Sequence, residues 1–288
     1  MDEVTKAVIP LGGLGTRFLP LSKILPKEFF PLVDRPLLHY ALEELKNSGI
    51  RDVIFVVNSH NKETVSQYFK KDVQLESILQ ERKKEESLEA VKSIGTLARA
   101  LNFSYVQQKE PLGDGNAVLQ AAKLVGESPC VLLYPDDVVE SKIPCASQLI
   151  RIYKTAQKPV QALFRLPKEK LSAYGVVDCE VIANRLYKIK KIVEKPSTPD
   201  AIVSDLTIVG RRILTAEVFD YLRKARPNKK GEVVLSEVLG EMVKDGKLVY
   251  GYEVEGRWWE CGDIKNWLRS HTYFTLKHPD YGKDMQKF

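Results

Sequence analysis

The sequence lacks the features that mark secreted and membrane proteins. Its 288 residues contain no signal-peptide pattern and no apolar run of about 18 residues, and the N-terminus leads directly into a strand pattern. The four cysteines form no CxxC pair and fall in different expected elements, which disfavours a disulfide framework or a zinc site. We therefore expect a cytoplasmic protein with reduced thiols and no membrane association.

An excess of charge of one sign is also missing. Lys and Arg number 44 against 38 Asp and Glu, and the net charge of +6 is spread along the chain in mixed-sign runs. The one dense run, Glu81 to Glu86, alternates in sign within a helical pattern. We interpret it as a solvated helix face, because a nucleic-acid-binding stripe would exclude its own acids. Nucleic acid is not an expected partner.

The hydrophobic runs predict an α/β fold. The segment Asp52–Val57 is a continuous apolar run, which is typical of a strand buried on both faces of a parallel sheet. Strands alternate with helices up to about residue 140, as in βαβ units, and after about Lys158 strands follow with fewer helices. We expect a Rossmann-like, mixed but mostly parallel sheet flanked by helices. Strands are predicted at 6–11, 52–57, 103–106, 130–134, 160–164, 175–177, 186–193 and 207–210, and helices at 37–48, 115–125, 216–225, 235–245 and 264–277.

A glycine-rich loop, Leu11 to Arg17, follows the first predicted strand. In an open parallel sheet this is where ligands bind, and Gly12, Gly13 and Gly15 would let backbone amides approach phosphate oxygens. The loop matches neither GxGxxG nor the P-loop, which disfavours a dinucleotide-dependent oxidoreductase.

Two basic residues, Arg17 and Lys27, flank this loop. Phosphoryl-type transfer needs cations against the charge that builds on phosphate oxygens and on the leaving group. The alternative is a strand-to-helix turn with incidental surface charges. No Ser–His or Cys–His arrangement suggests a covalent intermediate.

The loop Gly13–Arg17 and the segment Pro26–Glu28 resemble the signature of the sugar-1-phosphate nucleotidylyltransferases. Within this family the chain is most similar to the bacterial UTP–glucose-1-phosphate uridylyltransferases, because a charged helical insert at 75–94 resembles theirs and the related thymidylyltransferases look shorter there. Further similar segments follow in order at Gln108–Ala117, Leu132–Asp137, Ala173–Val177, Val193–Pro196, Ile208–Arg211, Gly231–Glu232 and Cys261–Asp263.

The resemblance implies a Mg2+-dependent enzyme that forms UDP-glucose and pyrophosphate from UTP and glucose 1-phosphate. It implies one domain, 1–288, with a nucleotide-binding part at about 1–140, a sugar-binding part at about 141–263 and a C-terminal helix at about 264–288. It also implies a homodimer or homotetramer, with the C-terminal helix as a candidate contact. The tryptophans near that helix fit such a contact or the core equally well (Trp258, Trp259 and Trp267).

On the nucleotide side, the resemblance assigns the amides of Leu11 and Gly12, with Gln108 and Gly113, to the uracil. A glutamine amide suits that base because it offers both a donor and an acceptor, although Gln108 could instead be a buried structural residue. Arg17 would bind the β- and γ-phosphates and Lys27 the α-phosphate. The other nucleotide-binding residues implied are Gly13, Gly15, Thr16 and Asp136.

The resemblance also implies the metal and sugar sites. Asp136, at the end of an apolar strand, and Asp263 would hold Mg2+, which prefers one or two carboxylates plus phosphate oxygens. The alternatives are helix caps, and Asp137 could orient its neighbour Asp136. The residues assigned to the sugar phosphate are Gly175, Glu194, Lys195, Gly210 and, as a weaker contact, Glu232.

The sequence departs from the family pattern at a few positions. Gly12 stands where alanine is more common, Asn116 where histidine is frequent and Pro135 where glycine often precedes the Asp pair. Two alternatives therefore stay open: an enzyme for dTTP or another sugar phosphate, and a non-catalytic sugar-nucleotide-binding regulatory paralogue.

Overall fold

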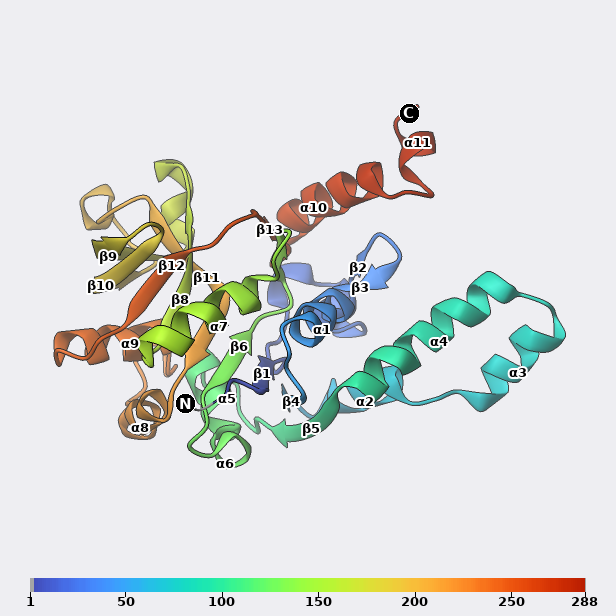
Figure 1. Cartoon of the computed structure of the whole chain (residues 1–288), viewed down its shortest axis with the longest axis horizontal. Coiled ribbons are helices and arrows are strands. Elements are labelled where there is room, and N and C mark those ends of the chain that lie inside the picture. Colours follow the sequence, from blue (N-terminus) through green and yellow to red (C-terminus); the bar gives the residue numbers. More distant parts are fainter. Residues whose placement is uncertain (1–2, 288) are drawn as a thin grey trace.

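The computed structural model describes residues 3–287 and contains a nine-stranded mixed sheet in the order β5-β4-β1-β6-β11-β8-β12-β10-β9 (Figure 1). Its first four strands in this order pair in parallel, whereas β11 pairs antiparallel with both β6 and β8. The strands are β1 Lys6–Pro10, β4 Asp52–Val57, β5 Asn102–Gln107, β6 Cys130–Leu133, β8 Val160–Arg165, β9 Gly175–Ala183, β10 Leu186–Glu194, β11 Leu206–Leu214 and β12 Tyr250–Glu253.

Helices cover both faces of the sheet, as the alternating pattern predicted. The helices are α1 Leu37–Asn47, α2 Lys62–Phe69, α3 Val73–Glu81, α4 Glu85–Ala100, α5 Asp114–Gln120, α6 Ala122–Val125, α7 Cys145–Ala156, α8 Ala216–Lys224, α9 Leu235–Lys244, α10 Ile264–Lys277 and α11 Gly282–Met285. Two small ribbons complete the fold, β2 Pro31–Leu32 with β3 Arg35–Pro36 and β7 Asp137–Glu140 with β13 Arg257–Glu260.

The core lies in two layers because successive strand residues face opposite sides of the sheet. In β1, Ala7 and Ile9 pack with α1 and α7, while Val8 packs on the other side with α5, α8 and α9. Val53–Val57 of β4 are buried throughout, which confirms the strand predicted to be covered on both faces.

A third, smaller apolar cluster holds the segments that surround the glycine loop. Phe18 and Phe30 stack with ring centroids 4.6 Å apart, and Trp267 of α10 lies 5.8 Å from Phe30. Trp259 of β13 is buried in the same cluster. Trp259 is therefore a core residue, and the partly buried Trp267 packs against the same cluster and anchors α10 there.

Two predictions from the sequence are corrected. The run Glu81 to Glu86 is exposed, as expected, but it is not a helix face: Arg82–Lys84 form the turn between α3 and α4, with Lys83 at φ 53°. The helix predicted at 115–125 is two helices, because the chain breaks at Ala121 between α5 and α6. Short apolar runs carry no signal for such a local break.

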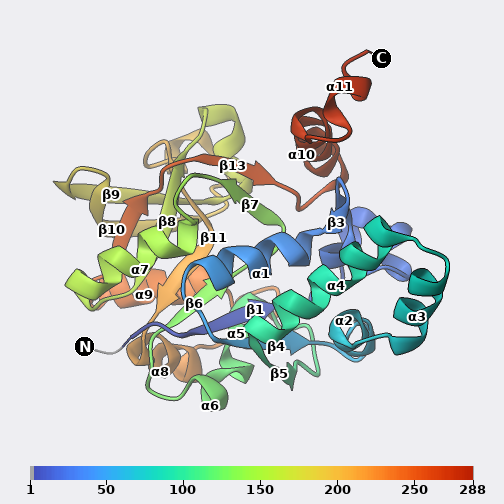
Figure 2. The ribbon, with the colours of Figure 1, turned by 45° about the vertical axis from the view of Figure 1, so that its right-hand side comes forward.

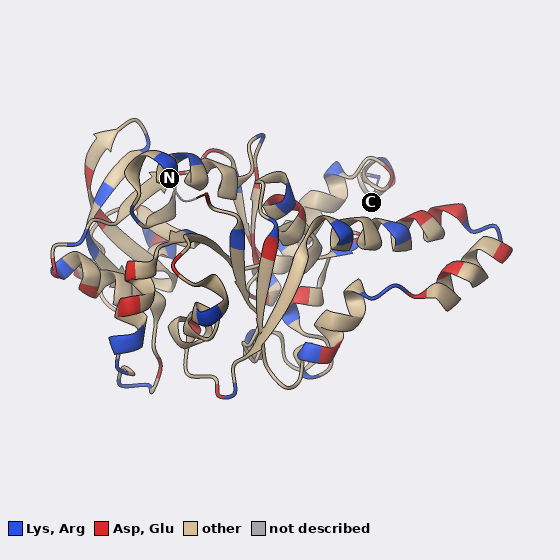
Figure 3. Ribbon diagram, turned by 60° about the horizontal axis from the view of Figure 1, so that its bottom comes forward, with Lys and Arg blue, Asp and Glu red and all other residues tan. Residues whose placement is uncertain are grey.

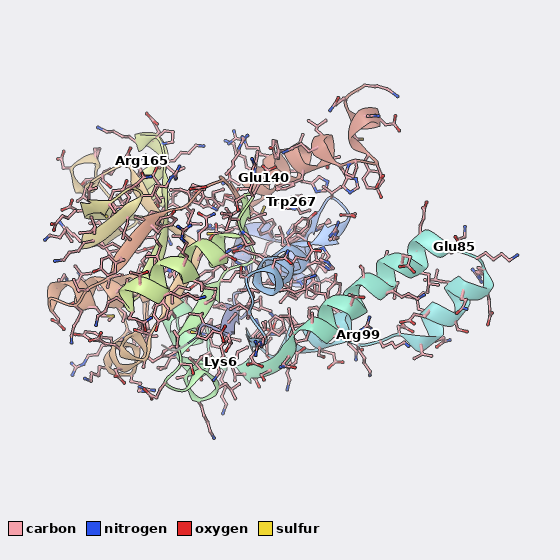
Figure 4. All side chains as sticks on the ribbon, in the orientation of Figure 1. Lys6, Glu85, Arg99, Glu140, Arg165 and Trp267 are labelled. Atoms are coloured by element: carbon pink, nitrogen blue, oxygen red, sulfur yellow. The ribbon has the colours of Figure 1, made fainter. Side chains whose placement is uncertain are left out.

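The α3–α4 hairpin extends away from the body of the protein (Figures 1 and 2). Charges of both signs follow each other along it (Figure 3). Glu85 lies near its outer end and Arg99 near its base (Figure 4). Among residues 3–287, no helix is long and apolar enough to cross a membrane.

A buried ion pair joins strand β11 to helix α1. Arg211 of β11 is 1% exposed, and its Nε and Nη2 donate to the carboxylate of Glu44 on α1 at 3.0–3.1 Å. Its Nη1 donates to the carbonyl of Tyr134 at 2.7 Å, immediately after β6. Glu44 also accepts from the amide of Ala146 at the start of α7. The Arg211 guanidinium thus holds α1 and the end of β6 to β11, and the Glu44 carboxylate also holds the start of α7.

We expect Arg211→Met to lower the free energy of unfolding by about 3–5 kcal/mol, because it leaves the Glu44 carboxylate buried without its cation. Urea denaturation checks this value. The control is Arg223→Met, since Arg223 is exposed on α8 and should cost less than about 0.5 kcal/mol. A double variant, Arg211→Met with Glu44→Leu, should recover part of the loss; equal stability of the Arg211 variant and the wild type would contradict the assignment.

Candidate active site

The glycine loop is held from beneath by two asparagines that follow β4. The side-chain amide of Asn58 donates to the carbonyl of Gly12 at 3.1 Å, and that of the buried Asn61 donates to the carbonyl of Leu11 at 2.5 Å. The amide of Leu11 donates to the carbonyl of Val56 at 2.7 Å. The sequence analysis did not predict this support.

The loop then turns sharply at Gly15, which has a left-handed φ of 62° that a residue with a side chain rarely adopts. Ser22 donates through Oγ to the Gly15 carbonyl at 2.8 Å. The turn brings Phe18 into the third apolar cluster. Burial of that ring leaves the neighbouring Arg17 at the wall of a cavity.

Gln108, at the end of β5, faces the loop. Its Nε2 donates to the carbonyl of Gly113 and to Oδ1 of Asn116, each at 3.1 Å. Its Oε1 lies only 2.6 Å from where a Cβ on Gly12 would stand. A cleft of about 550 Å³ opens here, lined by Pro10, Gly12, Gly13, Leu14, Thr16, Lys27, Gln108, Pro111, Gly113, Asp114, Ala117, Tyr134 and Glu232.

A second cavity of about 550 Å³ adjoins this cleft and shares Lys27 and Tyr134 with it. It brings together residues from both halves of the sheet and from the start of α10. Those assigned to a binding or metal site from the sequence are Arg17, Lys27, Asp136, Gly175, Glu194, Lys195, Gly210 and Asp263. The others are Tyr134, Asp137, Ala173, Tyr174, Ile208, Val209, Arg212, Ser236, Trp258, Glu260, Gly262 and Asn266.

Lys27 and Asp136 form an ion pair at 2.6 Å across the mouth of the loop. Burial favours the neutral forms of both groups, but their mutual attraction outweighs it. The pKa of Lys27 is therefore raised and the pKa of Asp136 is lowered. Both side chains stay charged at neutral pH.

Asp137 has a different environment from Asp136. Its Oδ2 accepts from the amide of Gly210 at 3.0 Å and its Oδ1 from Nε1 of Trp258 at 2.8 Å. Burial, followed by the charge of Asp136, raises the pKa of Asp137 to about 7. Asp137 thus ties β11 and β13 to the end of β6.

Asp263 caps α10 and also lines the cavity. Its Oδ1 accepts from the amide of Asn266 at 2.9 Å and its Oδ2 from the Asn266 side chain at 2.7 Å. Asn266 also donates to Glu260, whose carboxylate accepts from the hydroxyl of Tyr174. Burial raises the pKa of Glu260. Sequence reasoning missed Glu260, although it lies directly before the matched segment that contains Asp263.

The sugar-side residues form the opposite wall. Glu194 accepts from Oγ of Ser236 at 2.6 Å, and Nζ of Lys195 lies 3.7 Å from its other oxygen. A Cβ on Gly175 would stand 3.0 Å from that carboxylate, and one on Gly210 would stand 2.9 Å from the ring of Tyr134. Gly210 therefore needs glycine, whereas at Gly175 a side chain would require the Glu194 carboxylate to shift. Glu232 does not line this cavity; it lines the cleft beside the glycine loop and a third cavity that it shares with Glu194 and Lys195.

The donor set is that of a hard cation. Asp136 and Asp263 come from distant segments and line one cavity whose wall contains no histidine or cysteine. Within the described residues, no group of three or more His, Cys, Asp or Glu could hold a metal alone. Two carboxylates with positions left for phosphate oxygens and water suit a divalent cation such as Mg2+.

The comparisons agree with this geometry. A family model described as nucleotidyl transferase matches residues 6–275, and the chain belongs to that family. It is 36% identical over 288 residues to the UTP–glucose-1-phosphate uridylyltransferase of Staphylococcus haemolyticus (strain JCSC1435), covering 100% of this chain and 98% of the relative. These findings confirm the resemblance and the class of enzyme.

Solved structures confirm the fold. A UTP-bound UGPase from Acinetobacter baumannii superimposes with a TM-score of 0.88 at 32% identity, covering 99% of this chain and 98% of that one. A UDP-glucose pyrophosphorylase complexed with UDP-glucose gives a TM-score of 0.87 at 30% identity, covering 96% and 100%.

Glu28, next to Lys27, is a buried acid that the sequence did not single out. It is 2% exposed, and its Oε1 has no hydrogen-bond partner among the described residues. Burial raises the pKa of Glu28 from 4.5 to about 7, even though the charge of Lys27 lowers it. The folded protein therefore binds a proton here more tightly than the unfolded chain does.

Because the folded-state pKa is raised, the contribution of Glu28 to stability is present below about pH 4.5 and is lost as the pH rises to about 7. Glutamine does not titrate, so Glu28→Gln should not lose this stability. We therefore expect the free energy of unfolding of the variant, relative to that of the wild type, to be about 3 kcal/mol higher at about pH 8 than at about pH 5. Urea denaturation at both pH values checks it. The control is Glu86→Gln in the exposed turn, and a gain of similar size there would refute the assignment.

Proposed function

We propose that this protein transfers a uridylyl group from UTP to glucose 1-phosphate and so forms UDP-glucose and pyrophosphate. The observation that carries the proposal is the pair of adjoining cavities, one lined by the glycine loop and Gln108 and the other by Glu194, which meet at Lys27. A nucleotide and a sugar phosphate bound in them would have their phosphates side by side. The names of the full-length relatives support the same reaction.

The reaction needs one bond made and one broken. An oxygen of the sugar phosphate attacks the α-phosphorus of UTP in line, and the bond to the β-phosphate breaks to release pyrophosphate. Lys27 neutralises the α-phosphate and Arg17 the departing β- and γ-phosphates, which is electrostatic stabilisation of developing charge. Positioning of the two substrates supplies much of the remaining rate.

The base side of the cleft suits a pyrimidine with a ring N–H. The two hydrogens of Gln108 Nε2 are taken by Gly113 and Asn116, so Oε1 is left as an acceptor. Uracil and thymine can donate from N3, whereas cytosine cannot. The amides of Leu11 and Gly12 complete the base contacts that we propose.

The remaining assignments follow the same two walls. The loop residues Gly13, Gly15 and Thr16 bind the triphosphate of the nucleotide. On the sugar side, Glu194 accepts from sugar hydroxyls and Lys195 binds the sugar phosphate. Backbone at Gly175 and Gly210 approaches the sugar closely, and Glu232 is a further contact from the cleft.

We infer that the divalent cation is Mg2+, held by Asp136 and Asp263. When bound there, the cation would supply positive charge that neutralises the phosphate oxygens. Asp137 keeps the end of β6 in place through its bonds to Gly210 and Trp258. Asn266 fixes the carboxylate of Asp263.

Two broader predictions stand beside these. We propose a single domain over 1–288, with the nucleotide at about 1–140, the sugar at about 141–263 and the C-terminal helix beyond. We also propose a homodimer or homotetramer. The exposed Ile264, Leu268 and Leu276 of α10 support a contact through that helix.

Pyrophosphate release across a panel of nucleoside triphosphates and sugar 1-phosphates tests the function. We expect the highest kcat/KM with UTP and glucose 1-phosphate, loss of activity on chelation of divalent metal, and recovery with Mg2+. A preference for dTTP would instead indicate a thymidylyltransferase. Nucleotide binding without pyrophosphate release from any sugar phosphate would indicate a regulatory paralogue.

We expect Lys27→Ala to lower kcat by about 100- to 1000-fold, because it removes a cation that acts on the charge of the transition state. The melting temperature and the unfolding transition report whether the fold is intact. The matched control is Lys123→Ala, an exposed lysine of α6 outside both cavities, which should keep wild-type kinetics. Near-normal turnover of the Lys27 variant would rule out its assigned role.

A further inference from the structure

Two arginines stand side by side on β11 and face opposite sides of the sheet. Arg211 points to α1 and pairs with Glu44. Arg212 is also buried, at 8% exposed, but its Nε and Nη1 have no acceptor among residues 3–287. It is thus a buried guanidinium that forms no ion pair in the part of the chain that the structure describes, although the carboxylates of Glu194 and Glu232 line a cavity with it.

None of the described neighbours of Arg212 forms an ion pair with it. Its cross-strand neighbour on β8 is Gln161, a neutral amide whose own side-chain atoms also lack a partner. The nearby carboxylate of Asp114 accepts from the hydroxyl of Tyr134 and from the amide of Leu235. Burial of an uncompensated charge is costly, so the fold keeps this arginine at the expense of stability.

The position of Arg212 indicates what compensates it. Arg212 lines the cavity of the sugar side and also a neighbouring cavity of about 570 Å³, and Glu194, Lys195 and Ser236 line both as well. It does not line the cleft between the glycine loop and Gln108. The missing anion therefore belongs to the ligand on the sugar side rather than to the nucleotide.

We propose that Arg212, together with Lys195, binds the phosphate group of the sugar 1-phosphate. This inference rests on the proposed function. A sugar hydroxyl would leave the guanidinium charge uncompensated, whereas a phosphate carries negative charge and accepts two parallel hydrogen bonds from an arginine. Lys195 is half-exposed and already lies beside Glu194, so Arg212 is the buried cation of the pair.

The same phosphate becomes the β-phosphate of the product, so Arg212 contacts it before and after the reaction. Its loss should affect the sugar phosphate in the forward direction and the nucleotide sugar in reverse. Binding of UTP and of pyrophosphate should be unaffected. A purely structural role would not separate the substrates in this way.

The test compares steady-state kinetics of Arg212→Gln, Arg212→Lys and the wild type in both directions. We expect Arg212→Gln to raise the KM for glucose 1-phosphate by about 10- to 100-fold, the size of a lost charge-assisted contact, and to leave the KM for UTP within about twofold. The KM for UDP-glucose should rise in parallel, and that for pyrophosphate should not. Arg212→Lys should recover part of the loss because it keeps the charge. Arg223→Gln, an exposed arginine of α8, is the control.

Thermal unfolding supplies a second readout. Without ligand, Arg212→Gln should melt no lower than the wild type, because it removes an uncompensated buried charge. UDP-glucose should raise the melting temperature of the wild type but not that of Arg212→Gln, whereas UTP should raise both. If Arg212→Gln does not fold, Arg212→Met carries the test, and an unchanged KM for glucose 1-phosphate in that variant overturns the proposal.

Two further results would overturn it. One is an equal change in every KM and in kcat, together with a lower melting temperature and no recovery by lysine. The other is that the wild type prefers glucuronic acid 1-phosphate, and that Arg212→Gln abolishes this preference without changing the kinetics with glucose 1-phosphate. Arg212 would then bind a sugar carboxylate rather than the phosphate. Failure of the proposed function is distinct, since the wild type would then be inactive with UTP and glucose 1-phosphate; Arg212 is in that case tested with the sugar phosphate that the wild type accepts.

Discussion

The ion pair between Arg211 and Glu44 lies where the two halves of the sheet meet. β11 runs antiparallel between β6, the last strand of the parallel half, and β8 of the mixed half. Its Arg211 side chain holds the carbonyl of Tyr134, just before the two aspartates that face the cavity. Asp137, which follows β6, in turn accepts a hydrogen bond from the amide of Gly210 on β11. The end of β6 is thus fixed from both directions, and with it the carboxylate of Asp136.

At the neighbouring Arg212, the balance between stability and ligand binding is different. Arg211 and Arg212 are adjacent and both are buried, although a buried strand does not need a charged side chain at either position. One is compensated within the fold and contributes to its stability. The other lines the sugar cavity, and its Nε and Nη1 have no acceptor among the described residues. A folded protein keeps such a costly group where a ligand supplies the missing charge, which is why stability and binding are expected to oppose each other at Arg212.

The sequence predicted the elements whose signal is local. β4 has its predicted bounds, α10 runs from Ile264 to Lys277 as expected, and the glycine loop follows β1. The sequence also predicted that Arg17, Asp136 and Asp263 share a site, through family resemblance rather than through spacing. It could not tell which of the two arginines on β11 has a partner, because that depends on Glu44, which is far away in the chain. The raised pKa of Glu28 was equally hidden, since burial comes from packing and not from residue type.

Two departures from the family pattern make physical sense only together. Gly12 replaces the more common alanine, and Asn116 replaces a frequent histidine. In the structure both contact Gln108: Asn116 Oδ1 takes a hydrogen from its Nε2, and its Oε1 lies where a Cβ at position 12 would stand. With alanine at position 12 this placement of the amide would clash, so the glycine permits the position in which Asn116 and Gly113 hold it. Each change seen alone weakens the resemblance, whereas the pair preserves an oriented amide on the wall that faces the base.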